Sequence, residues 1–185
     1  MKNPWKKLSS EVKYENPWIK VEEDKVINPS GGNGIYGKVL FKNKAIGIVP
    51  LDDSLNTWII GQYRYTLDEY SWEIPMGGGP GHLSPLEGAK RELKEETGLS
   101  AQRWRQILRI HTSNSVTDEE GFVFIAEDLS QGDTSFDETE DLLIRKISFA
   151  EAVKMVMDGI ITDAISIAGI LKVEKILIEE GRFGK

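Results

Sequence analysis

Cysteine is absent from the 185 residues of this chain, and histidine occurs only twice. Without cysteine the chain can form neither a disulfide framework nor a thiolate zinc site, and a cysteine nucleophile is excluded. Any metal ion must therefore be held by oxygen or histidine ligands. The two histidines, His82 and His111, stand in no motif that assigns them a role.

Long apolar runs and an excess of positive charge are also missing. No apolar run approaches the roughly 20 residues that span a bilayer, and residues 1–10 are polar and basic, without the apolar core of a signal peptide. We therefore expect a soluble, cytoplasmic protein. The formal net charge of −7 argues against nucleic-acid and membrane partners, because both require a basic face.

The order of sequence patterns predicts the fold class. A length of 185 residues, 39% of them apolar, suits one compact domain. Strand-like patterns come first, one helix is inserted among them, and helical patterns come last, which predicts a mixed sheet packed between helices. The strand patterns cover residues 18–22, 35–41, 45–50, 57–64, 103–110 and 122–127, and the late helical patterns cover 149–157 and 164–178.

The best-defined helix is the inserted one, which runs to about Thr97. Ser84 is suited to cap its start, Pro85 suits the first helical position, and Glu87 completes a capping box three residues after the cap. Gly98 is a natural C-terminal stop.

Three glutamates of this helix, Glu92, Glu95 and Glu96, are spaced to share one face. Their mutual repulsion weakens a helix by roughly a few tenths of a kcal/mol per pair, and a divalent cation would neutralise it. The alternative is a solvated acidic face paired with neighbouring basic side chains. The glycine-rich segment 77–81 favours a site, because glycines let the backbone approach a ligand or metal closely.

From Gly77 to Leu99 the sequence resembles the Nudix box, the signature of hydrolases that cleave pyrophosphate linkages with a metal ion. The box here is Gly77, five residues, position 83, seven residues, and then RELKEETGL at 91–99. Eight of its nine defined positions match. The exception is Leu83, where the family usually has a glutamate, which implies fewer bound metals or a slower enzyme.

The resemblance implies a Nudix-type α/β/α sandwich, with a mixed sheet and an N-terminal antiparallel strand extension. It also implies that Glu95 and Glu96 are the principal metal ligands and that Glu92 is a third ligand or a base. The backbone carbonyl of Met76 would complete the metal shell, and Gly77 would contact substrate. The implied cofactor is Mg²⁺, with Mn²⁺ as a substitute.

Outside the box, segments 62–64, 72–77, 115–119 and 158–164 resemble the branch that hydrolyses ADP-ribose and other nucleoside diphosphate sugars. Arg64 is a candidate phosphate contact, or else a surface ion pair. Glu73 is a candidate contact for base or ribose, or else a solvent-facing strand residue. Glu119 resembles a further catalytic glutamate, but it lies between Asp118 and Glu120, and the sequence does not decide which of the three acts.

The branch also implies a homodimer, with an N-terminal strand region (residues 1–45) at its interface and a Nudix hydrolase domain in residues 46–185. Trp5, Trp18 and Trp72 could stack on a nucleobase, although aromatic residues in β-rich sequence more often pack in the core. The leading hypothesis is Mg-dependent hydrolysis of a nucleoside diphosphate sugar such as ADP-ribose to a nucleoside monophosphate and a sugar phosphate. The alternatives are another nucleotide substrate, either a nucleoside triphosphate or a dinucleoside polyphosphate, and a catalytically weak nucleotide-binding module.

Overall fold

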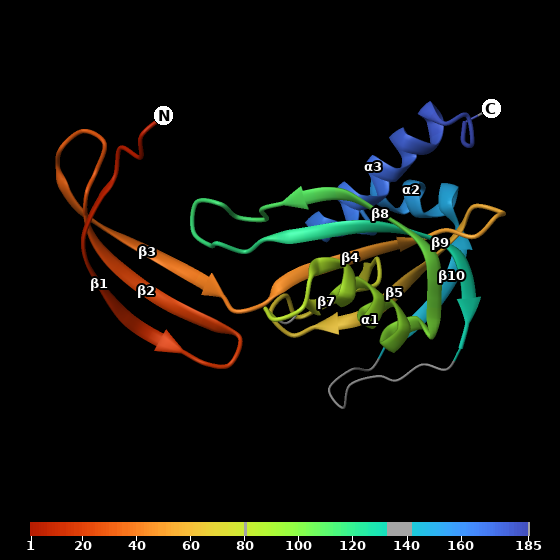
Figure 1. Ribbon diagram of the computed structural model, residues 1–185, viewed down its shortest axis with the longest axis horizontal. Coiled ribbons are helices and arrows are strands. Elements are labelled where there is room, and N and C mark those ends of the chain that lie inside the picture. The colour runs from red at the N-terminus through yellow and green to blue at the C-terminus, as the bar shows by residue number, and fades with distance from the viewer. Residues whose placement is uncertain (80, 133–141, 185) are drawn as a thin grey trace.

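The computed structural model describes residues 1–79, 81–132 and 142–184, so Pro80 of the glycine-rich segment lies outside it (Figure 1). In chain order the elements are β1 (Lys6–Glu15), β2 (Ile19–Ile27), β3 (Asn33–Phe41), β4 (Lys44–Pro50), β5 (Asn56–Arg64), β6 (Glu69–Glu73), β7 (Met76–Gly79), α1 (Pro85–Thr97), β8 (Leu99–Ile110), β9 (Gly121–Gln131), β10 (Leu143–Ser148), α2 (Phe149–Met157) and α3 (Ala164–Glu179).

The first three strands form an antiparallel sheet of their own, in the order β1-β2-β3, which lies beside the rest of the molecule in Figure 1. Every residue of β1 is exposed. At the centre of the sheet, Lys38 Nζ lies 3.1 Å from Glu22 Oε2 and 2.7 Å from Asp24 Oδ2. This sheet therefore depends on strand pairing and ion pairs rather than on an apolar core of its own.

The remaining strands form two further sheets, ordered β7-β4-β9-β8 and β10-β5-β6. Strands β4 and β9 pair in parallel, and the other neighbouring strands pair antiparallel. Helix α1 packs against β4, β7 and β8, whereas α2 and α3 cover the opposite side, as Figure 1 shows. The expected mixed sheet between helices is confirmed.

Two apolar clusters bind these layers together, and β4 contributes to both. Ile46 and Ile48 belong to the cluster beneath α1, whereas Val49 belongs to the cluster beneath α2 and α3. Both faces of β4 are thus buried, which explains why its sequence is a continuous apolar run rather than an alternating one.

Helix α1 begins and ends where its sequence predicts. The Ser84 backbone N–H donates to Glu87 Oε2 at 2.8 Å, and the Glu87 N–H donates to Ser84 Oγ at 3.3 Å, so the capping box is complete. Gly98 ends the helix in the left-handed region at φ 70°. The sequence patterns did not predict β1, β6, β7 and β10. Strand β7 is almost all glycine because α1 packs closely on it, with the Gly79 Cα only 3.4 Å from a Cβ placed on Gly88.

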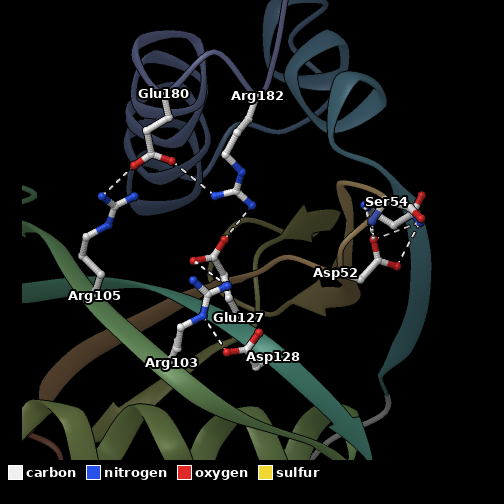
Figure 2. A network of polar contacts seen from close by, with 9 residues as sticks. Asp52, Ser54, Arg103, Arg105, Glu127, Asp128, Glu180 and Arg182 are labelled. Atoms are coloured by element: carbon white, nitrogen blue, oxygen red, sulfur yellow. Dashed lines mark hydrogen bonds and ion pairs between the residues drawn. The ribbon is translucent and has the colours of Figure 1, made fainter.

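A network of ion pairs ties the end of α3 to strands β8 and β9 (Figure 2). Arg105 donates to Glu180 Oε1 at 2.9 Å, and Arg182 lies 2.7 Å from Glu127 Oε1. This network holds the far end of the helix whose first residues line the cavity described below. In the part of the chain that the structure describes, no helix has both the length and the apolar character needed to cross a membrane.

Candidate active site

The main cavity has a volume of about 680 Å³, within the range of small-molecule sites. It lies between the β5–β6 hairpin, β7, the loop before β9 and the start of α3. Five residues that the sequence singled out line it together: Arg64, Glu73, Met76, Gly77 and Glu119. Segments far apart in sequence thus converge on one space.

Arg64 and Glu73 lie on neighbouring antiparallel strands and form an ion pair at the cavity wall. Arg64 Nε donates to Glu73 Oε1 at 2.8 Å, and a second guanidinium nitrogen contacts Glu73 Oε2. Glu73 is only 2% exposed, so the alternative of a solvent-facing strand residue is wrong. The hydrogen bond that Arg64 donates to Glu73 raises the pKa of Arg64, which stays cationic beside the cavity.

Two hydrogen bonds fix the turn between β6 and β7. The Ile74 backbone N–H donates to the buried Ser166 Oγ of α3 at 3.1 Å. The Met76 N–H donates to Glu96 Oε2 of α1 at 3.0 Å. The turn is therefore held from both sides of the sheet, and Glu96 is oriented toward the strand that lines the cavity.

Arg91 joins the other two helix glutamates to β7. Its guanidinium donates to Glu95 Oε2 at 2.9 Å and to the Gly78 carbonyl oxygen at 3.0 Å, and it also forms an ion pair with Glu92. Glu92 is 5% exposed, whereas the side chain of Glu95 is 32% exposed. Arg91 therefore compensates the charge of a largely buried carboxylate.

Gly77 is required by the close approach of Glu92. A Cβ at position 77 would lie 2.1 Å from Glu92 Oε2 and 2.4 Å from Glu92 Cδ, far inside van der Waals contact. The strand can pass this carboxylate only because residue 77 has no side chain. A glycine strand against a buried carboxylate is the kind of close approach that the sequence suggested.

The donor chemistry of this region fits a divalent cation. Glu92, Glu95 and Glu96 offer oxygen ligands within one helical turn, and hard divalent cations prefer oxygen. Among the described residues, however, no three acidic or histidine side chains converge closely enough to hold a metal ion. Two of the carboxylates contact Arg91 and the third accepts from Met76, so gathering all three around one ion requires side-chain rotation.

The structure gives different contacts to Asp118, Glu119 and Glu120, among which the sequence could not choose the catalytic residue. Asp118 Oδ1 accepts from the Phe41 N–H at 2.8 Å. Glu120 Oε2 lies 2.5 Å from Lys44 Nζ, and Lys44, followed by Arg109, holds the pKa of Glu120 below its usual range. Glu119 lines the cavity and accepts a hydrogen bond from Thr112 Oγ1.

Several further residues line the cavity beside the five named above. Thr112 lines the cavity and lies in no segment with a recognisable motif. Thr162 and Asp163 also line it, and they lie in segment 158–164, whose resemblance to the branch assigned no role to a single residue. Trp18, which the sequence offered as a candidate for base stacking, also lines the cavity and is 66% exposed, so it does not pack in the core. Only the pairing of strands distant in sequence brings these side chains to one place.

Comparison with known proteins gives two family matches and several relatives. The NUDIX domain model matches residues 42–159, and a model described as a nucleoside diphosphate sugar hydrolase N-terminal domain matches residues 5–39. An ADP-ribose pyrophosphatase of Mycobacterium tuberculosis is 32% identical over 176 residues, covering 91% of this chain and 83% of that protein.

A second relative and a solved structure agree with these family matches. An ADP-ribose pyrophosphatase of Bacillus subtilis is 31% identical over 122 residues, covering 65% of this chain and 66% of that protein. A solved structure titled as an ADP compounds hydrolase superposes with a TM-score of 0.87 at 23% identity, covering 97% of both chains. The latter likeness supports the fold described above.

Proposed function

The chain belongs to the Nudix family of metal-dependent pyrophosphohydrolases, and we propose that it hydrolyses a nucleoside diphosphate sugar of the ADP-ribose type. The products are a nucleoside monophosphate and a sugar phosphate. The observation that carries the proposal is the cavity of about 680 Å³, which Arg64, Glu73, Gly77 and Glu119 line together. Glu92 and Glu96 of α1 lie outside this lining but contact the strand that forms it, at Gly77 and Met76.

The substrate class follows from the chemistry of the cavity wall. Arg64 is held by a buried carboxylate and offers a guanidinium suited to bidentate contact with phosphate oxygens. Glu73 holds Arg64 and retains oxygens that can accept from ribose or base. Trp18 and Phe41 add aromatic surface for a planar base. A ligand with two phosphates, hydroxyl groups and a base would offer a partner to Arg64, to Glu73 and to the aromatic surface.

The helix glutamates are proposed to hold the metal ion, with Glu95 and Glu96 as principal ligands, Glu92 as the third and the Met76 carbonyl completing the shell. We propose Mg²⁺, with Mn²⁺ as a substitute. A bound divalent cation supplies charge stabilisation on the pyrophosphate and lowers the pKa of the attacking water. It also supplies the local positive charge that a protein of net charge −7 otherwise lacks at this place.

The remaining chemistry falls to the protein's own side chains. Glu119 lies in the cavity wall and is assigned as the proton acceptor for the attacking water. As the oxygen of water bonds to phosphorus, one of its protons passes to a Glu119 carboxylate oxygen. The bridging P–O bond breaks, and its electron pair leaves on the bridging oxygen as part of the second phosphate product. Thr112, which donates to that carboxylate, orients it.

We further propose that the chain acts as a homodimer through residues 1–45, with residues 46–185 as the hydrolase domain. Large apolar side chains are exposed on the N-terminal sheet and its turns: Trp5, Leu8, Val12, Tyr14, Trp18, Ile35 and Phe41. Residues 1–45 hold nine lysines and five acidic residues, although the whole chain carries 23 basic and 30 acidic residues. A basic, partly apolar sheet is thus complementary to the acidic remainder, residues 46–185, of a second copy.

The decisive experiment is turnover of a panel comprising ADP-ribose, GDP-mannose, ATP and a dinucleoside polyphosphate, with magnesium and with EDTA. We expect a nucleoside diphosphate sugar to be cut best, with activity abolished by EDTA and restored by Mg²⁺ or Mn²⁺. Glu95→Gln should reduce turnover by at least about 100-fold, because it removes a metal ligand.

Two outcomes would change the conclusion. Preference for ATP or the dinucleoside polyphosphate would keep the chemistry and replace the substrate class. Absence of metal-dependent turnover with every substrate would instead favour the nucleotide-binding module.

A further inference from the structure

We propose that the N-terminal sheet positions Glu119 for catalysis within the same chain, with Asp118, Glu120 and Tyr36 as positioning residues. The inference rests on the role assigned to Glu119 above. It concerns the loop between β8 and β9, which the structure shows attached on one side to β3 and on the other to β4.

The backbone of β3 continues its pairing into the loop. The Val39 N–H donates to the Val116 carbonyl oxygen at 2.9 Å, and the Asp118 N–H donates to the Val39 carbonyl oxygen at 3.2 Å. Val39 and Thr117 form an isolated parallel bridge. The loop is therefore held as a short additional strand along the edge of the N-terminal sheet.

Two side-chain hydrogen bonds reinforce that attachment. Asp118 Oδ1 accepts from the Phe41 N–H at 2.8 Å. Tyr36, from the middle of β3, donates its hydroxyl to the Ser115 carbonyl oxygen at 2.6 Å. Asp118 therefore has a structural partner immediately before Glu119.

The residue after Glu119 is fixed to the hydrolase body. The Ala45 N–H donates to the Glu120 carbonyl oxygen at 3.0 Å, and the Glu120 carboxylate pairs with Lys44 at 2.5 Å and with Arg109. Glu119 thus lies between two anchored neighbours, one held by β3 and one by β4. Of these three acidic residues, Glu119 is the one that lines the cavity.

This arrangement matters because a displacement of about 1 Å at a reacting group can cost roughly 100-fold in rate. Any movement of the N-terminal sheet relative to the body is transmitted to Glu119 through Val39, Phe41 and Tyr36. The sheet is therefore part of the catalytic geometry.

The test compares Asp118→Ala with Asp118→Asn. Alanine removes the oxygen that accepts from Phe41, whereas asparagine keeps an acceptor oxygen and removes only the charge. We expect Asp118→Ala to lower kcat by about ten- to 100-fold, with KM changed less than about twofold. Asp118→Asn should restore most of kcat. Hydrogen exchange in residues 111–121 should be faster in Asp118→Ala than in the wild type, and the melting temperature should stay close to it.

Further variants keep the proposal falsifiable. Tyr36→Phe, alone and combined with Asp118→Ala, removes the second anchor without removing the ring, and Asp53→Ala on an exposed loop is the matched control. Wild-type kcat in the double variant would overturn the inference. So would equal losses in Asp118→Ala and Asp118→Asn, because Asp118 would then act through its charge.

Glu119→Gln, measured in parallel, separates the inference from the assignment on which it rests. A loss of kcat in Glu119→Gln without a loss in the anchor variants overturns the inference alone. Wild-type kcat in Glu119→Gln overturns the assignment of Glu119 and the inference with it.

Discussion

At the residue scale, the site depends on a few contacts that leave no room for substitution. Glu73 is buried because Arg64 compensates its charge, and Glu92 is buried because Arg91 does the same. Removing one partner of such a pair leaves an uncompensated buried charge, which costs more than the pair itself contributes. Gly77 tolerates substitution least, because any side chain at position 77 would overlap the Glu92 carboxylate.

We predict that Gly77→Ala lowers metal-dependent kcat by at least about tenfold, because the added methyl group displaces the Glu92 carboxylate from β7. Gly81→Ala is the matched control from the same glycine-rich segment. Its added Cβ meets only the Lys42 carbonyl oxygen, at an ordinary 3.7 Å. Steady-state kinetics of both variants check the prediction, and equal activity in the two would contradict it.

At the element scale, α1 is stabilised by its own sequence before any packing is considered. The capping box at Ser84 satisfies N–H groups of the first turn, and Gly98 closes the last turn without strain. The helix therefore presents its glutamates from a rigid element. The N-terminal sheet, in contrast, is stabilised by strand pairing and by ion pairs between β2 and β3.

Ser84→Ala should destabilise the protein by about 1 kcal/mol, because it removes the hydroxyl that accepts from Glu87. For a chain of this size the expected loss in Tm is about 2–4 °C. Ser84→Asp, which retains a capping oxygen, should keep the wild-type Tm. Thermal unfolding of the three proteins measures the effect, and identical Tm values would show that the cap contributes nothing.

The N-terminal sheet should lose stability in acid. Lys20, and after it Lys38, lower the pKa of Glu22 from 4.5 to about 2. A lowered pKa means that this carboxylate stabilises the sheet above about pH 4.5 and that its contribution is lost as the pH falls toward 2. The protection factors of amides in residues 6–41, which correct for the slower intrinsic exchange at low pH, should therefore fall over that range, and less so in Glu22→Gln. An unchanged profile in Glu22→Gln, with Asp53→Asn as control, would refute this.

At the scale of the whole molecule, charge is divided unevenly between the N-terminal sheet and the rest. Nine lysines and five acidic residues lie in residues 1–45, so the acidic excess of the chain is carried by the remainder. Complementary charge steers association and selects partners. This uneven charge distribution and the exposed apolar side chains of the sheet are the two observations that support the proposed homodimer.

Val12→Asp is predicted to convert the dimer to a monomer, because it places a charge among the exposed apolar residues of β1. Val12 is 51% exposed, and the control Ile178→Asp changes an equally apolar residue of α3 that is 47% exposed. Sedimentation equilibrium should give twice the 20.8 kDa chain mass for the wild type and for Ile178→Asp. A monomeric wild type would refute the proposed dimer.

The sequence by itself determined the features that are encoded locally. The caps and length of α1, the shared face of its three glutamates and the buried character of β4 all follow from spacing within a few residues. The lack of cysteine restricted the metal ligands to oxygen and histidine. Strand β1 was missed because it is exposed throughout and thus lacks the pattern that burial on one face imposes.

Only the tertiary structure decided which side chains meet. Asp118, Glu119 and Glu120 are equivalent by composition, and strand pairing with β3 and β4 sends two of them to anchors and one to the cavity. Likewise, Arg64 and Glu73 are separated by a hairpin, and their contact depends on strand register. Contacts of this kind depend on how distant strands align, and no local pattern records that alignment.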